Sequence, residues 1–189
     1  QIDGLIFLPM YLSVKGVEEG VSVKNISGTW GLNYKWKPEK ENTIDFLVKI
    51  KKEKGRDIYL PYMENDTINY YKTIQLYVGY NFNQDKSINY SLKILDNKHY
   101  SKLERERTIL FNPGDRKIVH TTNIPLIDGK MICEKDNKEI TNNSLVEMRY
   151  NPNGKNGMIW EPLKVRSDKT EPQWFEIANN VWKTITNPI

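Results

Sequence analysis

The 189-residue chain has a single cysteine, Cys133, and only two histidines, His99 and His120. One cysteine excludes a disulfide within the chain and any zinc site built from several cysteines, and it fits a reducing compartment. Neither histidine lies in a local pattern typical of catalysis, so neither is given a catalytic role. Cys133 falls in a strand-like run, and we expect it to be a core residue.

The chain also lacks a long apolar run and a strong excess of charge. The apolar stretch "GLIFLP" at residues 4–9 is too short to cross a membrane, and no basic segment precedes it, so it is not typical of a signal peptide. It is interpreted as a buried strand at the start of a fragment of a longer protein. The net charge of +4 permits an anionic partner without requiring one.

What the chain does contain is a series of short runs rich in Ile, Val, Tyr, Phe and Trp, separated by turn residues. After Pro172, apolar residues recur every three or four positions, which predicts a helix. A mainly β fold follows, in which the later strands and the helix fit a small OB-fold barrel; a β-sandwich is the alternative. The runs expected as strands are 4–9, 32–37, 43–50, 73–80, 88–95, 107–111, 130–134, 144–150 and 158–166.

The stretch "LNYKWKP" is the first candidate for phosphate binding. Lys35 and Lys37 share one face of the expected strand, and Trp36 takes the other face. Two ammonium groups about 7 Å apart can both contact one phosphate group. The alternative is a solvated strand face with a packed tryptophan.

The stretch "LKVRSDKTEPQ" is the second candidate. Lys164 and Arg166 alternate with apolar residues, which is typical of a half-buried strand, and Asp168 and Lys169 follow at its exit. Two cations, a carboxylate and a further cation suit a polyphosphate with its metal. They also suit an exposed edge strand, where charged side chains deter aggregation.

Two further features have a functional and a structural interpretation. Asp3 precedes the apolar run, where an ionised carboxylate needs a cationic partner or a metal, or else it is a turn residue before Gly4. A series of tyrosines can stack on nucleic-acid bases or be half-buried in a barrel wall. The series is Tyr59, Tyr62, Tyr70, Tyr71, Tyr77 and Tyr80.

Taken in order, "IDGLIF", "YKWKPEKENTIDF" and "WEPLKVRSDKTEPQ" resemble three motifs of the covalent nucleotidyltransferase superfamily, which comprises mRNA capping guanylyltransferases and polynucleotide ligases. Asp3 before the glycine, "TIDF" after the paired lysines and Trp160 before the basic run are similar to capping enzymes. The trailing "WFEIANNVWKTITNPI" is similar to the segment that joins guanylyltransferase and methyltransferase modules in multifunctional capping enzymes of large cytoplasmic DNA viruses.

The resemblance implies a domain order and partners. Residues 1–55 are expected to be the C-terminal part of a nucleotidyltransferase domain, 56–173 an OB-fold domain, and 174–189 a helix and linker toward a following module. The implied substrates are GTP and a 5′-diphosphate RNA, with Mg²⁺ or Mn²⁺ as cofactor. The implied parent carries an upstream nucleotidyltransferase part and a methyltransferase module, and it acts in the cytoplasm, a virion or a viral factory, away from membranes.

The resemblance also implies roles for individual residues. Lys35 and Lys37 match the lysines that hold the α-phosphate, and Asp3 matches an acidic residue near the metal. A group on the mobile barrel matches side chains that close over the β- and γ-phosphates; it consists of Lys164, Arg166, Asp168 and Lys169.

Some positions depart from the family pattern. The chain has no Lys-x-Asp-Gly, the motif whose lysine takes GMP, so the fragment alone is expected to be inactive. Lys164 stands where the family often has Arg, and Gln173 stands where it often has Asn. The alternatives are the matching part of an ATP-dependent polynucleotide ligase, or a plain OB-fold module that binds nucleic acid or a protein.

Overall fold

The computed structural model describes residues 4–21, 23, 30–38, 41–80, 108–114 and 118–187. The chain forms two compact units, Gln1–Asn42 and Thr43–Ile189, and each is described by itself. Asp3 and the run expected as a strand at 88–95 lie outside the described residues.

The first unit contains one antiparallel pair, β1 (Leu5–Phe7) and β2 (Tyr34–Trp36), in which Ile6 lies opposite Lys35. The side chains of β1 are exposed, Ile6 to 61%. The expectation of a buried strand at 4–9 is therefore wrong for this chain. The physical reason is that the described residues of this unit form only the two-stranded sheet, without a second layer that covers it.

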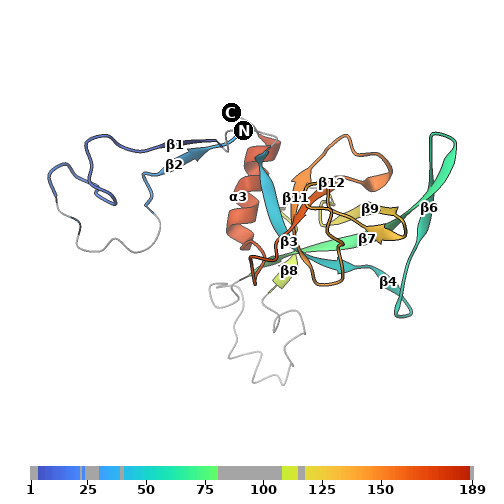
Figure 1. Ribbon diagram of the computed structural model, residues 1–189. Helices are drawn as coiled ribbons and strands as arrows, with labels where there is room; N and C mark the ends of the chain where they lie inside the picture. The colour runs from blue at the N-terminus through green and yellow to red at the C-terminus, as the bar shows by residue number, and fades with distance from the viewer. Residues whose placement is uncertain are drawn as a thin grey trace, which may run out of the picture. The chain divides into compact units, whose positions relative to one another are not determined.

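The second unit is built on one antiparallel sheet with the strand order β10-β9-β7-β3-β11-β12, and β6 and β8 pair with other stretches of β7 (Figure 1). A separate hairpin, β4–β5, follows β3. The elements are β3 (Thr43–Ile50), β4 (Lys52–Glu53), β5 (Arg56–Asp57), β6 (Leu60–Glu64), β7 (Thr67–Gly79), β8 (Thr108–Leu110), β9 (Thr121–Ile127), β10 (Lys130–Met131), β11 (Leu145–Tyr150), a 3-10 turn (Lys155–Gly157), β12 (Trp160–Val165) and α3 (Phe175–Thr186).

The sheet curls so that the start of β12 meets the start of β9. The Thr122 hydroxyl accepts a hydrogen bond from the Trp160 backbone N–H at 3.1 Å and donates one to the Gly157 carbonyl at 3.2 Å. The Trp160 indole N–H donates to the Val119 carbonyl at 2.8 Å. A mainly antiparallel sheet closed in this way, with one C-terminal helix, is an OB-fold barrel, so the predicted fold class is confirmed.

Aromatic side chains fill the barrel. The Phe46 and Trp160 rings meet edge-on with centroids 4.9 Å apart, and Tyr150 packs against Trp182 at 4.8 Å. Trp182 comes from α3, which packs on β3 and β7. The helix predicted after Pro172 is thus present, and it belongs to the barrel core rather than to a linker.

Along the chain, the boundary between the two units falls between Asn42 and Thr43, whereas the expected boundary was 55/56. Thr43–Ile50 pairs with β7 on one side and β11 on the other, so it is a central strand of the barrel. The buried residues Ile44, Phe46 and Val48 alternate along it, with their side chains in the core. Residues 43–55 therefore belong to the OB-fold unit.

Candidate functional site

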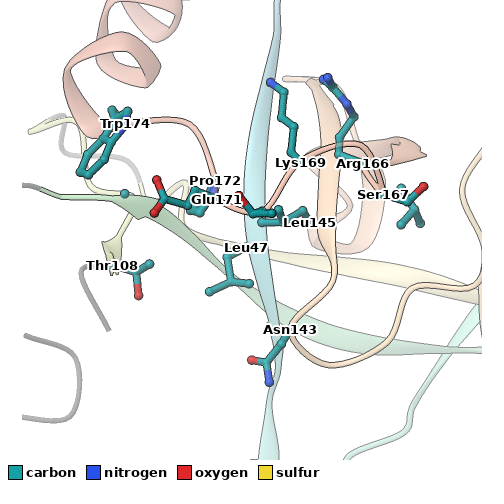
Figure 2. Close-up of a pocket in the computed structure, with 13 residues that line it drawn as sticks. Leu47, Thr108, Asn143, Leu145, Arg166, Ser167, Lys169, Glu171, Pro172 and Trp174 are labelled. Carbon is teal, nitrogen blue, oxygen red and sulfur yellow. The ribbon is translucent and has the colours of Figure 1, made fainter. Parts of the chain in front are cut away.

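The basic stretch after β12 forms a tight turn. The Lys169 backbone N–H donates to the Arg166 carbonyl at 3.1 Å, which closes a four-residue turn, and the Arg166 N–H donates to the Leu145 carbonyl at 2.8 Å. The turn places the side chains of Arg166 and Lys169 on the same side, and Figure 2 shows both extending in the same direction beside β3. The Arg166 and Lys169 cations are therefore presented together.

Both cations converge on the carboxylate of Asp45, the third residue of β3. The Arg166 Nη1 lies 3.0 Å from each Asp45 carboxylate oxygen, and the Lys169 Nζ lies 2.5 Å from Oδ2. The Asp45 side chain is only 8% exposed. A buried carboxylate requires such partners, because an unpaired charge in a barrel wall is strongly disfavoured.

Asp168 holds the other edge of the same guanidinium. Its carboxylate accepts from Arg166 Nε at 3.0 Å and from Nη2 at 2.8 Å, a two-point contact. The hydrogen bond to Asp168 raises the pKa of Arg166 further, although partial burial opposes it, and the same bond holds the pKa of Asp168 far below its usual range. Both groups are therefore fully charged at neutral pH. Lys164 adds a weaker attraction that also lowers the pKa of Asp168.

A third carboxylate completes the cluster. Glu147 on β11 lies 3.7 Å from Arg166 Nη1 and opposite Lys164 in the strand register. Arg166 and Lys169 thus face three carboxylates, Asp45, Glu147 and Asp168, so the cluster has a formal charge of −1. An anion that binds Arg166 competes with these carboxylates, and Asp168, at 58%, is the most exposed of the three.

Gln173 fastens the cluster to the sheet. Its side-chain carbonyl accepts from the Asp45 N–H at 3.2 Å, and its own N–H donates to the Asp45 carbonyl at 2.9 Å. Its carbonyl accepts from the Gly79 N–H at 2.9 Å. Gln173 therefore links β3 and β7 to the loop that carries Arg166 and Lys169, which fixes the position of that loop.

The other predicted residues lie in the first unit. Lys35 is exposed on β2 and Lys37 follows that strand. Gly4, with φ +111, lies against Trp36 and Lys37. A Cβ added to Gly4 would come 3.2 Å from Lys37 Cγ. Asp3 lies outside the described residues. Among the residues that are described, no three His, Cys, Asp or Glu side chains form a group that could hold a metal ion.

Asp45, within "TIDF", and Glu147 are members of the cluster to which the motifs assign no role. A signal for Asp45 was available, since a carboxylate within an otherwise apolar strand requires a buried partner. Gln173 departs from the family pattern, and its side-chain amide contacts the backbone of Asp45.

Fold and cluster together define an OB-fold barrel that carries an arginine–lysine pair bound to buried and exposed carboxylates. Residues 41–189 match the family model described as the mRNA capping enzyme, C-terminal domain, which begins close to the first strand of the barrel. The whole chain is also similar to the "Probable mRNA-capping enzyme" of Acanthamoeba polyphaga mimivirus, at 30% identity over 207 aligned residues. The chain spans 15% of that relative's length.

The chain therefore belongs to the family of mRNA capping enzyme C-terminal domains. This confirms the resemblance drawn from the motifs. In the described part of the chain, no helix is long and apolar enough to cross a membrane.

Proposed function

We propose that this chain is the C-terminal part of an mRNA guanylyltransferase, which transfers GMP from GTP through a covalent lysine adduct to the 5′-diphosphate end of RNA. The nucleophilic lysine would come from an upstream nucleotidyltransferase part of the same parent. Membership of the capping family supports the proposal, and it favours guanylyl transfer over the ligase alternative and over a plain OB-fold module.

The observation that carries the proposal is the convergence of Arg166 and Lys169 on Asp45. In-line transfer of GMP expels pyrophosphate, so the β- and γ-phosphates need cations that are already in position. The planar fork of arginine suits phosphate oxygens, and Asp45 holds that fork in place from the face of β3 opposite to the core. In the proposed reaction, Arg166 keeps Asp45 and exchanges the exposed Asp168 for a phosphate.

Lys35 and Lys37 are proposed to hold the α-phosphate. Both side chains are cationic, and only Trp36 separates the two residues in the sequence, so both could contact the same phosphate group. Barrel closure would assemble the site, and opening would release pyrophosphate and admit the RNA. Mg²⁺ or Mn²⁺ is proposed to accompany the triphosphate. Because the described residues do not gather a metal-binding group, no step is assigned to the ion. The parent is proposed to carry a methyltransferase module and to act in the cytoplasm, a virion or a viral factory.

The test is covalent labelling. The 189-residue chain and a parent chain that includes the upstream part are each incubated with α-labelled GTP and Mg²⁺ or Mn²⁺, then run on a denaturing gel. The parent should carry label and this chain should not, because the expected nucleophile is absent from it. An unlabelled parent contradicts guanylyl transfer, and parent labelling by ATP in place of GTP favours the ligase alternative.

A further inference from the structure

Two hairpins of the OB-fold unit extend beyond the barrel. The first is β4–β5, which follows β3, and the second is formed by β6 and the first part of β7. Figure 1 shows both on the side of the barrel away from α3. We call residues 51–72 the arm. Lys51 directly follows β3, whereas Asp45 is near its start, so a rise of about 3.3 Å per residue places the arm about 20 Å from the ion-pair cluster.

The structure separates the tyrosine series, for which the sequence leaves both base stacking and partial burial open. Tyr77 is buried in the barrel, and Tyr62 packs against Tyr71 with ring centroids 6.0 Å apart. Tyr59 and Tyr70 are instead exposed, to 52% and 49%. Of the tyrosines in the arm, these two therefore offer the most ring surface to a ligand.

The ring of Tyr59 is held by a cation beneath it. Lys72 Nζ lies 4.6 Å from the ring centroid and 2.8 Å from the carboxylate of Asp57. Tyr70 and Lys72 alternate along β7, so their side chains share one face of the hairpin, about 7 Å apart along the strand. Tyr59 and Tyr70 are therefore neighbours on that face. One side of the Tyr59 ring is covered by Lys72, and the exposed remainder is suited to stacking.

The β4–β5 hairpin adds cations beside these rings. Lys54 and Gly55 have φ values of +47 and +81, as in a two-residue type I′ turn, so Lys54 lies at the tip. Arg56 precedes Tyr59 by three residues. The side chains of Lys51, Lys54 and Arg56 are exposed, and they make no ion pair with any carboxylate in the part of the chain that the structure describes. These charges are therefore available to an anionic partner.

We propose that the arm binds a single strand of RNA. Tyr59 and Tyr70 stack on unpaired bases, and Lys51, Lys54 and Arg56 contact the phosphates of the same strand. Exposed rings alone would suit a protein partner as well. Their position beside cations that lack carboxylate partners favours a chain that carries both flat rings and regular negative charge.

The tip of the β6–β7 hairpin limits this surface. It carries Glu64 and Asp66, and residues 60–71 include no lysine or arginine, so a polyanion is disfavoured there. The strand is therefore expected to cross the base of the arm. The choice of RNA among single-stranded nucleic acids rests on the proposed function, in which RNA accepts GMP. The separation of about 20 Å from the cluster places the arm on nucleotides downstream of the 5′ end.

Fluorescence anisotropy tests the proposal with the 189-residue chain and an unstructured RNA of about 12 nucleotides, labelled at its 3′ end. A 5′-hydroxyl end removes the phosphates that the ion-pair cluster could bind. Tyr59→Ala and Tyr70→Ala should each weaken binding about five- to a hundredfold, and phenylalanine at either position should retain most of the affinity. Tyr11→Ala, at a tyrosine 71% exposed in the first unit, is the matched control.

Salt dependence tests the phosphate contacts separately. Lys54→Gln and Arg56→Gln should each reduce the slope of log Kd against log salt concentration by about 0.7. Lys183→Gln, at an exposed lysine in the last turn of α3, should leave the slope unchanged. The tyrosine variants should also keep the slope, because they remove no charge. A duplex of the same sequence should bind at least about fivefold more weakly, since its bases are already stacked and paired.

The proposal is overturned if Tyr59→Ala and Tyr70→Ala bind the RNA as tightly as the Tyr11→Ala control. It is also overturned if Lys54→Gln and Arg56→Gln leave the salt slope unchanged, and a protein partner then becomes the better explanation of the exposed rings. Circular dichroism establishes that each variant is folded. Binding of a 5′-hydroxyl RNA requires no lysine adduct. An unlabelled parent therefore leaves the arm standing as an RNA-binding surface, and an arm without RNA affinity leaves guanylyl transfer standing.

Discussion

The carboxylate of Asp45, near the start of β3, accepts two hydrogen bonds from the guanidinium of Arg166, which lies 121 positions later in the chain. Lys169 reaches the same carboxylate from the far side of a tight turn. The proposed phosphate-binding cations are therefore anchored in the barrel wall, and their positions depend on a residue that would not itself contact a phosphate.

The first prediction concerns this anchor. Asp45→Ala should lower the free energy of unfolding by about 2–3 kcal/mol, because it leaves two cations without their buried partner. Glu139→Ala is the control, since Glu139 and Lys130 form an exposed pair 3.3 Å apart, and its cost should stay under about 1 kcal/mol. Urea unfolding of both variants measures the difference. Equal losses would show that Asp45 contributes no more than a surface carboxylate.

The second prediction separates the two half-reactions in the parent. Arg166→Ala and Lys169→Ala should slow formation of the enzyme–GMP adduct by about ten- to a hundredfold, the effect of losing roughly 1.5–3 kcal/mol of charged hydrogen bonding. Transfer from a preformed adduct to RNA should suffer less, because the β- and γ-phosphates have already left.

The control for these rates is Arg149→Ala, which removes another arginine paired with a carboxylate, Glu161, elsewhere on the barrel. If both half-reactions slow equally in Arg166→Ala and Lys169→Ala, the two residues support the barrel or bind RNA. If neither slows, the turn is only a charged loop.

The third prediction concerns the first unit. In the parent, Lys35→Ala and Lys37→Ala should each reduce covalent GMP transfer at least about tenfold, which corresponds to about 1.4 kcal/mol of transition-state stabilisation. Lys15→Ala, in the same unit, provides a comparison outside the motif. Labelling at the wild-type level in both motif variants removes the α-phosphate assignment.

The fourth prediction is a pH dependence. Because the hydrogen bond from Arg166 lowers the pKa of Asp168 below the ordinary 3.8, the pair stabilises the folded state above about pH 4. That contribution is lost only as the pH falls through the lower folded-state value. A carboxyl NMR titration should place the Asp168 midpoint well below 3.8, and Arg166→Gln should raise it. Arg149→Gln should leave it in place, and a midpoint unchanged by Arg166→Gln would contradict the contact.

The fifth prediction tests the core. Trp160 is buried among Phe46, Phe111 and Tyr150 and donates its indole N–H to Val119. Trp160→Ala should cost about 3–5 kcal/mol of folding stability. Trp36→Ala, at an exposed tryptophan, should change it by no more than about 0.5 kcal/mol. Comparable losses in thermal unfolding would contradict the placement of Trp160 in the core.

The sequence predicted the barrel because hydrophobic alternation is a local property. The run 43–50 matches β3 at both ends, since its apolar residues alternate toward the core. Residues 60–64 and 121–127 were not recognised as strands, because Pro61 and Pro125 interrupt them; proline is tolerated only where its missing N–H is not needed.

The site was predicted in part, for a different reason. Basic residues in "VRSDK" are visible in the sequence, but their carboxylate partners are contributed by strands far away along the chain. Glu147 on β11 looks like an ordinary exposed strand residue until its register against Lys164 and its distance to Arg166 are known. Long-range pairing of this kind has no local signal.

The pairing of β3 with β11 also fixes an order of events during synthesis. β3 spans Thr43–Ile50 and can join β7 as soon as that strand emerges, but its other edge is filled by Leu145–Arg149. Until then, one edge of β3 has unpaired backbone groups, and Asp45 has neither of its cations. Pairing of β3 with β11, about a hundred residues later, is slow compared with forming a local hairpin. A nascent chain that stalls before residue 145 therefore exposes an unpaired sheet edge that is prone to aggregation. The barrel and its anchored cations thus complete together, once residues 145–169 have been synthesised.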